Sequence, residues 1–302
     1  PIYLIVLGCS MALILLSPYF TLFTMLENNR MIKDMGLATI LLAGLLLSVF
    51  SASSVIYQEV ESKTVLTIIS KPVRRSSFIL GKYLGLLFAL LVAEYLLNLV
   101  LVQVVRTEIT EAAYSKSDYP VLFGYFFSIL FTLFMAAFAN FFYERSFTSS
   151  AISLALPVFS LMFLALCLLD NQWNLKPLFS TLDYKLLMAG LLVFLATALL
   201  AAIATAASTR LPQIPTLFLC GLIFLLGLFS DYLFGKNAEA SPVAHFFYAI
   251  LPNLQIYWVI DAVLDNKAIP FDYLQYVSIY TLLFLSGILA LAMALFQEKE
   301  AQ

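Results

Sequence analysis

Charged residues are concentrated between Gln58 and Lys82, in a chain that is otherwise largely apolar. This segment, QEVESKTVLTIISKPVRRSSFILGK, holds five of the 16 Lys and Arg residues. Its carboxylate, ammonium and guanidinium groups can form ion pairs with another protein or with lipid phosphates. The sequence contains no phosphate-binding G-x-x-x-x-G-K-[ST] loop, and it suggests no Ser-His-Asp set and no paired carboxylates. The chemistry that this segment predicts is therefore recognition of a charged partner, not catalysis.

A short amphipathic helix is expected in the first half of this loop. Its apolar residues fall on one broad side, and its polar residues face water: Val60, Val65, Leu66, Ile68 and Ile69 against Glu59, Glu61, Ser62 and Lys63. Pro72 ends the helix, because proline cannot continue an α-helix. Arg74 and Arg75 follow, and they either pair with acids of a partner or extend to lipid headgroups.

The order of residue types in this loop resembles that of the permease subunits of ABC-2 type transporters. In that family Glu, Thr, Lys-Pro, a basic residue and Gly-Lys precede the third span. The matching positions are Glu59 or Glu61, Thr64, Lys71-Pro72, Arg74 with Arg75, and Gly81-Lys82. The run Leu251-Pro252-Asn253 is similar to the branch that includes the nitrous-oxide-reductase maturation permease.

This resemblance implies that the loop forms a coupling helix, which seats in a groove of a cytoplasmic ATPase subunit. Lys63 belongs to the same charged surface, and the shorter loop with Glu144 and Arg145 is the expected second contact. The alternative is that these charges only fix the topology and contact lipid headgroups.

The composition is that of an integral membrane protein. Of its 302 residues, 63% are hydrophobic and 11% charged, and the mean hydropathy is +0.98. The net charge of -2 and the absence of a long basic tract argue against nucleic-acid binding. Cys9, Cys167 and Cys220 lie in apolar runs and His245 is the single histidine, so we expect neither a disulfide framework nor a metal site. The chain begins at Pro1 without Met, and residues are expected to precede it.

Eight uncharged or nearly uncharged runs are long enough to cross a bilayer, which takes about 20 residues. They are Pro1 to Leu26, Met35 to Tyr57, Phe78 to Val105, Pro120 to Tyr143, Ser146 to Leu169, Leu186 to Thr209, Leu211 to Ser230 and Tyr273 to Gln297. Ser241 to Ile260 is rich in aromatics and contains two prolines, so it is expected to form one or two short helices at the membrane surface. The fold class is therefore all-α: a polytopic membrane bundle of about eight helices in one domain, residues 1–302. Six is the alternative, because ABC-2 permeases usually have six spans.

The distribution of charge predicts the orientation. Cations are packed into short loops on the side of Gln58 to Lys82, which places that side in the cytoplasm. With eight spans, both termini are cytoplasmic, and Asp231 to Asp272 is extracytoplasmic. The expected location is the cell (inner) membrane.

Glu94 is an ionisable residue within a predicted span, and Asn98 follows one helical turn later on the same face. A carboxyl group in hydrocarbon usually faces the bundle interior or an aqueous path. Two interpretations stay open: a position on a substrate path or dimer seam, or a protonated structural group bonded to a neighbouring helix.

The function expected from the resemblance is that of a non-catalytic permease subunit, which exports or flips a substrate. Its partners would be two cytoplasmic ATPase subunits that bind ATP and Mg²⁺, a second permease copy or paralogue, and membrane lipid. One alternative is an ATPase-coupled scaffold or mechanotransmission subunit that acts on an extracytoplasmic protein. An ion-coupled secondary transporter is a third, which Glu94 alone supports weakly.

Overall fold

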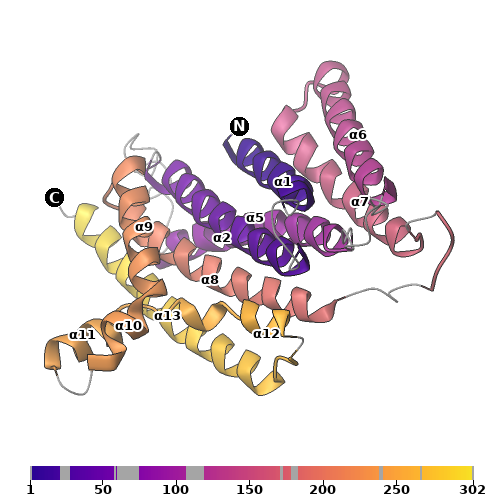
Figure 1. Ribbon diagram of the computed structural model, residues 1–302. Helices are drawn as coiled ribbons and strands as arrows, with labels where there is room; N and C mark the ends of the chain where they lie inside the picture. Colours follow the sequence, from indigo (N-terminus) through magenta and orange to yellow (C-terminus); the bar gives the residue numbers. More distant parts are fainter. Residues whose placement is uncertain are drawn as a thin grey trace. The chain divides into compact units, whose positions relative to one another are not determined.

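The chain folds into α-helices. The structure is a computed structural model that describes residues 2–20, 28–57, 59, 75–106, 119–170, 173–177, 183–237, 241–265 and 267–300. Nearly all of these residues are helical (Figure 1), and β structure among them is limited to an isolated bridge between Leu169 and Leu175. The expected all-α fold class is confirmed.

Seven helices in the described part are long and apolar enough to cross a membrane, and each overlaps a predicted span. They are α1 (Ile2–Phe20), α2 (Asn28–Ala52), α5 (Arg75–Val104), α6 (Tyr119–Tyr143), α7 (Phe147–Cys167), α8 (Tyr184–Ser208) and α13 (Phe271–Glu300). A π-helical turn, η2 (Ser53–Tyr57), extends α2. The chain is thus a multi-pass membrane protein with a helical bundle fold.

Hydroxyl groups inside these helices bond to their own backbone. Ser128 Oγ donates to the Gly124 carbonyl at 2.8 Å, Ser160 Oγ to Leu156 at 2.7 Å and Thr281 Oγ1 to Val277 at 2.7 Å. A hydroxyl in hydrocarbon has no water to bond to, so a carbonyl one turn back is the nearest acceptor. Scattered Ser and Thr residues are therefore compatible with spans.

The seventh of the eight predicted spans, Leu211 to Ser230, is shorter in the structure than the sequence suggests. Its helix α9 (Gln213–Leu228) has 16 residues. At about 1.5 Å per residue it reaches about 24 Å, less than the roughly 30 Å of a hydrocarbon core. Short elements follow: α10 (Ser230–Leu233), η3 (Gly235–Asn237), α11 (Pro242–Ile250), η4 (Gln255–Tyr257) and α12 (Ile260–Leu264).

The predicted short helices in Ser241 to Ile260 are present. α11 has nine residues and none of them is buried. It is bent by 48° from the helical segment Gln255–Leu264, and the two together would count as a broken span or a re-entrant loop. Their position at the membrane surface stays a prediction.

The chain divides into two compact units, and α2, α5 and α8 contribute to both. The first unit comprises Pro1–Ala43, Val92–Gly190 and Val263–Lys267, and the second comprises Gly44–Leu91, Leu191–Ala262 and Ala268–Gln302. In the first unit α6 and α7 form an antiparallel hairpin (Figure 1). Tyr125 of α6 is fully buried and donates to the Leu99 carbonyl of α5 at 3.0 Å.

Arg106, just after α5, caps the C-terminus of α7 in the first unit. Its guanidinium donates to the carbonyls of Leu166 at 2.7 Å and Leu169 at 3.0 Å. The last carbonyls of a helix lack partners within the helix and carry partial negative charge. A cation in this position therefore stabilises the helix end and joins α7 to α5.

In the second unit, two pieces of the chain between α8 and α13 contact each other, and the second piece also contacts α13. The first is α9, where Leu254 N donates to the Gly227 carbonyl at 3.0 Å. The second begins at Asn253, whose backbone N donates to the Tyr280 hydroxyl at 2.8 Å. Further along, the hydroxyls of Tyr257 and Thr281 are 2.7 Å apart. α10, η3 and α11 form an excursion between the two pieces.

Gly227 is required at this junction. A Cβ placed there would lie 2.8 Å from the Pro252 carbonyl oxygen, a backbone atom that cannot easily move away. The junction is also held by Asp231, which accepts hydrogen bonds from Tyr248 at 2.8 Å and from Asn253 at 3.0 Å. These bonds fix the two ends of the excursion to each other.

Candidate functional site

The base of the charged loop is held together by an ion pair. Lys82 Nζ lies 2.6 Å from Glu59 Oε1, and the side chains are 25% and 33% exposed, respectively. The same ammonium group lies 5.4 Å from the centroid of the Phe78 ring. Because Glu59 follows η2 and Lys82 lies in α5, the pair joins the two helices that enter and leave the loop.

Phe78, the aromatic residue beside the Lys82 ammonium group, packs against an apolar cluster of the second unit. Phe78 stacks on Phe296 of α13 with ring centroids 5.5 Å apart. The buried members of the cluster come from three helices: Ile79, Ala206, Ala292 and Phe296. Arg210 adds a polar contact, since its Nε donates to the Leu295 carbonyl at 3.0 Å. The start of α5 and the ends of α8 and α13 thus form one packed body.

Most of the predicted coupling residues lie outside the described residues. These are Glu61, Lys63, Thr64, Lys71, Pro72 and Arg74. Arg75 is the first residue of α5, and its side chain is likewise outside the described part. The predicted coupling helix therefore stays a prediction. Among these residues the structure describes Glu59, which it places at the base of the loop.

The second predicted contact, Glu144 and Arg145, lies in a three-residue turn between α6 and α7. Both residues are exposed. Asn140 Nδ2 donates to the Arg145 carbonyl at 2.6 Å, which fixes the turn. Glu144 has a φ of 52°, a left-handed conformation that is unfavourable for residues with a Cβ. Glycine is the usual residue there, so the turn carries a strained glutamate.

Replacing Glu144 with Gly is expected to raise the stability of the protein by about 1 kcal/mol, because the left-handed strain disappears. Glu144→Ala removes the same carboxylate and keeps the strain, so it should be the less stable variant. Thermal denaturation of the two variants in detergent, followed by circular dichroism, measures the difference. A Gly variant no more stable than the Ala variant would contradict the strain at this turn.

Glu94 and Asn98 lie together in α5, as predicted. Glu94 is 2% exposed, which confirms that it faces the protein interior. Asn98 Nδ2 donates to the Glu94 backbone carbonyl at 2.9 Å. The Asn98 side chain packs against Gly190 of α8, where an added Cβ would lie 2.1 Å from Asn98 Oδ1. Glu94 is therefore enclosed in the first unit, and the partly buried Asn98 packs closely against α8.

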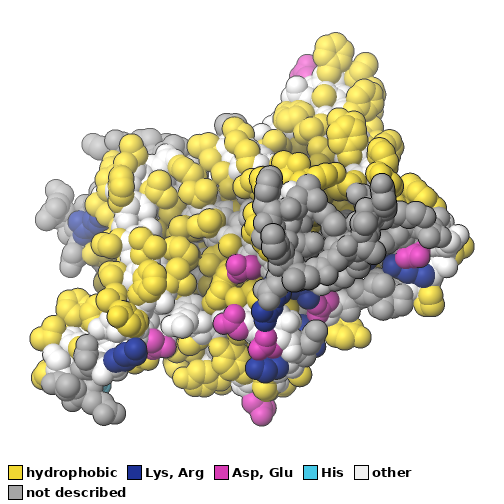
Figure 2. All heavy atoms as spheres, viewed as in Figure 1, with side chains coloured by type: hydrophobic (Ala, Val, Ile, Leu, Met, Phe, Trp, Pro, Cys, Tyr) yellow, Lys and Arg dark blue, Asp and Glu magenta, His cyan; other side chains and the backbone are white. Residues whose placement is uncertain are grey.

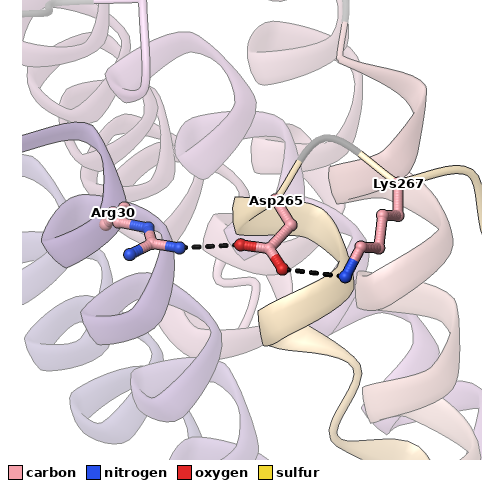
Figure 3. Close-up of polar contacts among 3 residues, drawn as sticks. All are labelled: Arg30, Asp265 and Lys267. Atoms are coloured by element: carbon pink, nitrogen blue, oxygen red, sulfur yellow. Dashed lines mark hydrogen bonds and ion pairs between the residues drawn. The ribbon is translucent and has the colours of Figure 1, made fainter.

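A charged group at the start of α2 was not predicted from the sequence. Asp265 accepts from Arg30 at 2.9 Å and pairs with Lys267 at 3.1 Å, as Figure 3 shows. The hydrogen bond and charge of Lys267, together with Arg30, lower the pKa of the Asp265 carboxyl group. Arg30 and Asp265 are 235 residues apart, and no local pattern links them.

A second ion pair also starts from α2. Lys33 Nζ lies 2.8 Å from Asp183 Oδ2, with exposures of 9% and 28%. Asp183 precedes α8, and its other carboxylate oxygen accepts from Lys185 N at 3.1 Å, as an N-cap does. The N-cap could have been recognised from an Asp directly before a long apolar run.

Each of these ion pairs joins residues that the predicted topology assigns to the same side of the membrane, and the orientation itself stays a prediction. Arg30, Lys33, Asp183, Asp265 and Lys267 all belong to loops or helix ends assigned to the extracytoplasmic side. Glu59 and Lys82 are both assigned to the cytoplasmic side, and so are Arg210 and the end of α13, which contact each other. The contacts favour a shared side for Asp265 and the start of α2, as the placement of residues 231–272 requires.

The surface is mostly apolar, and charged side chains are grouped at a few places on the visible face (Figure 2). Large side chains of α6 are among the most exposed, for example Phe126 at 61%, Phe134 at 67% and Phe141 at 80%. Of the cysteines, Cys167 and Cys220 are buried as expected for apolar packing residues, whereas Cys9 is exposed on α1. Exposed apolar residues along spans are suited to contact with lipid.

Comparisons with protein-family models, with curated proteins and with solved structures found no match.

Proposed function

We propose that this chain is the membrane-spanning subunit of an ATP-driven transporter of the ABC-2 type, which exports or flips its substrate. The observation that supports this most is the base of the charged loop. There the Glu59–Lys82 ion pair joins the end of α2–η2 to α5, directly beside the contacts of α5 with α8 and α13. The residue order of the loop, which resembles the coupling segment of ABC-2 permeases, adds to this support.

The proposed mechanism converts movement of a partner into movement of helices. The ATPase subunits bind and hydrolyse ATP with Mg²⁺, and their closure displaces the loop that is docked on them. Because Glu59 and Lys82 hold the two ends of the loop together, a force on it acts on both flanking helices at once. Phe78 transmits the displacement to α13 through Phe296.

The expected assembly contains two ATPase subunits and two permease chains, either identical or paralogous, in the cell (inner) membrane. The termini of the chain then lie in the cytoplasm, close to the ATPases. Glu94 and Asn98 are assigned to the substrate path or to the seam between the two permease chains. The tight packing of Asn98 against Gly190 favours a role in packing over direct substrate contact.

A second candidate function is transmission of ATP-driven movement to an extracytoplasmic protein without transport. It is favoured by the excursion between α9 and Asn253, which exposes Tyr232, Val243 and Phe246 at 59% to 68%. Such a surface fits a protein partner as well as lipid. ATPase activity that rises with a transported substrate would support transport. ATPase activity that rises only with an extracytoplasmic protein would support transmission.

Charge reversal at Glu59 tests the docking role. Glu59→Lys should weaken retention of the ATPase during purification of the complex by about tenfold, which corresponds to about 1.4 kcal/mol. The same change breaks the internal pair with Lys82, so the double variant Glu59→Lys with Lys82→Glu is needed. This charge swap restores the internal ion pair, and with it the thermal stability, but leaves the reversed charge toward the partner.

The expected result is that the charge-swap variant regains thermal stability but still fails to retain the ATPase subunit during purification. Lys267→Glu is the matched control: it disrupts an ion pair on the side assigned to the exterior, so retention should stay at the wild-type level. If the swap restores full retention, Glu59 acts only within the chain. If no ATPase accompanies the wild-type chain from its native membrane, the proposed function is wrong.

A further inference from the structure

The second unit contains an apolar cavity with one cation at its end. The cavity has a volume of about 470 Å³ and lies between α8, α9, α13 and the segment Ile250 to Pro252. Its walls are side chains such as Ile203, Ile223 and Ile288, and Arg210 is the only ionisable residue among the described residues that line it. Its size is in the range of small-molecule sites, which extends from about 300 to 1,000 Å³.

The position of Arg210 is fixed. The residue lies between α8 and α9, and the bond from its Nε to Leu295 holds the guanidinium at the end of the cavity where α8 and α13 finish. A guanidinium group is a planar fork of donors that suits phosphate oxygens.

The depth of the cavity indicates the kind of ligand. Its lining extends from Ile203 in α8 to Arg210 just beyond that helix, and from Ile288 to Leu295 along α13. At about 1.5 Å per residue each stretch covers about 10 Å. One leaflet of a hydrocarbon core is about 15 Å deep, so the cavity reaches well into the acyl-chain region. A free phosphate ion would leave these apolar walls without a partner.

We propose that this cavity binds a phospholipid with an anionic headgroup. The acyl chain occupies the apolar space between α8, α9 and α13, and the phosphate binds Arg210. The exposed residues Ile250 and Leu291 form part of the rim, so an acyl chain can enter from the side. Basic pockets between membrane helices on the cytoplasmic side are suited to such headgroups.

Lipid binding in this cavity does not require the ATPase. It concerns the helices whose ends meet at the base of the charged loop, and a lipid bound there would join α9 to α8 and α13. The expected consequence is that anionic lipid stabilises the second unit more than zwitterionic lipid does.

Lipid binding is measured on the purified full chain by native mass spectrometry and by the midpoint of thermal denaturation. Phosphatidylglycerol, phosphatidylcholine of equal chain length and inorganic phosphate are the three probes. Phosphatidylglycerol should be retained and should raise the midpoint, whereas inorganic phosphate should do neither. Arg210→Gln should reduce the preference for phosphatidylglycerol about fivefold, the ratio that corresponds to about 1 kcal/mol for one cation. Arg210→Lys should keep most of the preference.

Two further variants separate the cavity from general surface charge. Leu219→Trp fills the cavity and should reduce retention of both lipids without touching Arg210. Arg145→Gln removes an exposed cation at the α6–α7 turn in the first unit and should have no effect. An unchanged preference in Arg210→Gln, a full effect from inorganic phosphate alone, or unchanged retention in Leu219→Trp would each overturn the proposal.

Discussion

Replacing Lys33 with Met is expected to destabilise the protein by roughly 3 kcal/mol, the low end of the range for breaking a buried ion pair. The Lys33 side chain is 9% exposed and its ammonium group lies 2.8 Å from Asp183. Without Lys33, the Asp183 carboxylate remains in a partly buried position without its cation. Thermal denaturation of the purified chain, followed by circular dichroism, measures the loss.

Asp183→Asn provides the matched test of the same pair. Asparagine is as good an N-cap as aspartate, so the start of α8 keeps its cap while the charge is lost. The single variant should be destabilised because the Lys33 ammonium is left buried. The double variant with Lys33→Met should recover most of the loss, since both partners are gone. A double variant as unstable as the sum of the two single variants would show that the residues do not interact.

The ion pair also predicts a dependence on pH. Burial raises the pKa of Asp183, but the hydrogen bond and charge of Lys33, with the N–H groups of Lys185 and Leu186, outweigh it and lower the pKa overall. Because the pKa is lowered, the charged Asp183 stabilises the fold at pH values above the ordinary Asp pKa of about 3.9. This stabilisation is lost as the pH falls through the pKa of Asp183 in the folded protein. The wild-type protein should therefore be more stable than Asp183→Asn at neutral pH, and this difference in stability should disappear as the pH falls below about 4.

The spans were predictable because hydrocarbon imposes a simple condition on sequence. Helices such as α6 and α8 must be apolar over about 20 residues, and their lengths follow directly from uncharged runs. The length of α9 was overestimated, because an apolar run does not show where the chain leaves the helix. In the structure α9 ends at Leu228, and the chain around Pro252 approaches Gly227 closely just before that end.

The candidate site was predictable only where it is local. Glu94 and Asn98 share one face of one helix, and their proximity follows from helical spacing. Lys33 with Asp183 and Arg30 with Asp265 join segments 150 and 235 residues apart. Their pairing depends on which helices are neighbours in the bundle, and hydropathy does not determine that arrangement. The cavity beside Arg210 was missed for the same reason, because its walls come from four separate segments.

Gly190→Ala is expected to destabilise the first unit by about 1–3 kcal/mol, the usual effect of overpacking a close contact. The new methyl group would lie 2.1 Å from Asn98 Oδ1 and 2.8 Å from Asn98 Cγ. Asn98 can avoid this only by rotating, which breaks its 2.9 Å hydrogen bond to the Glu94 carbonyl. Gly287→Ala is the matched control: in α13 an added Cβ meets nothing within 4 Å. It should be neutral or stabilising by up to about 1 kcal/mol, because alanine favours a helix more than glycine does.

A double-mutant cycle assigns the effect to Asn98. Asn98→Ala removes the side chain that the methyl group would meet, so adding Gly190→Ala in that background should cost almost nothing. Thermal midpoints of wild type, the two single variants and the double variant measure the coupling. If Gly190→Ala is equally damaging with and without Asn98, the close approach is between the helix backbones and not between Gly190 and this side chain. The asparagine would then be free to rotate toward a substrate, and the packing role proposed for the Glu94 and Asn98 pair would have to be abandoned.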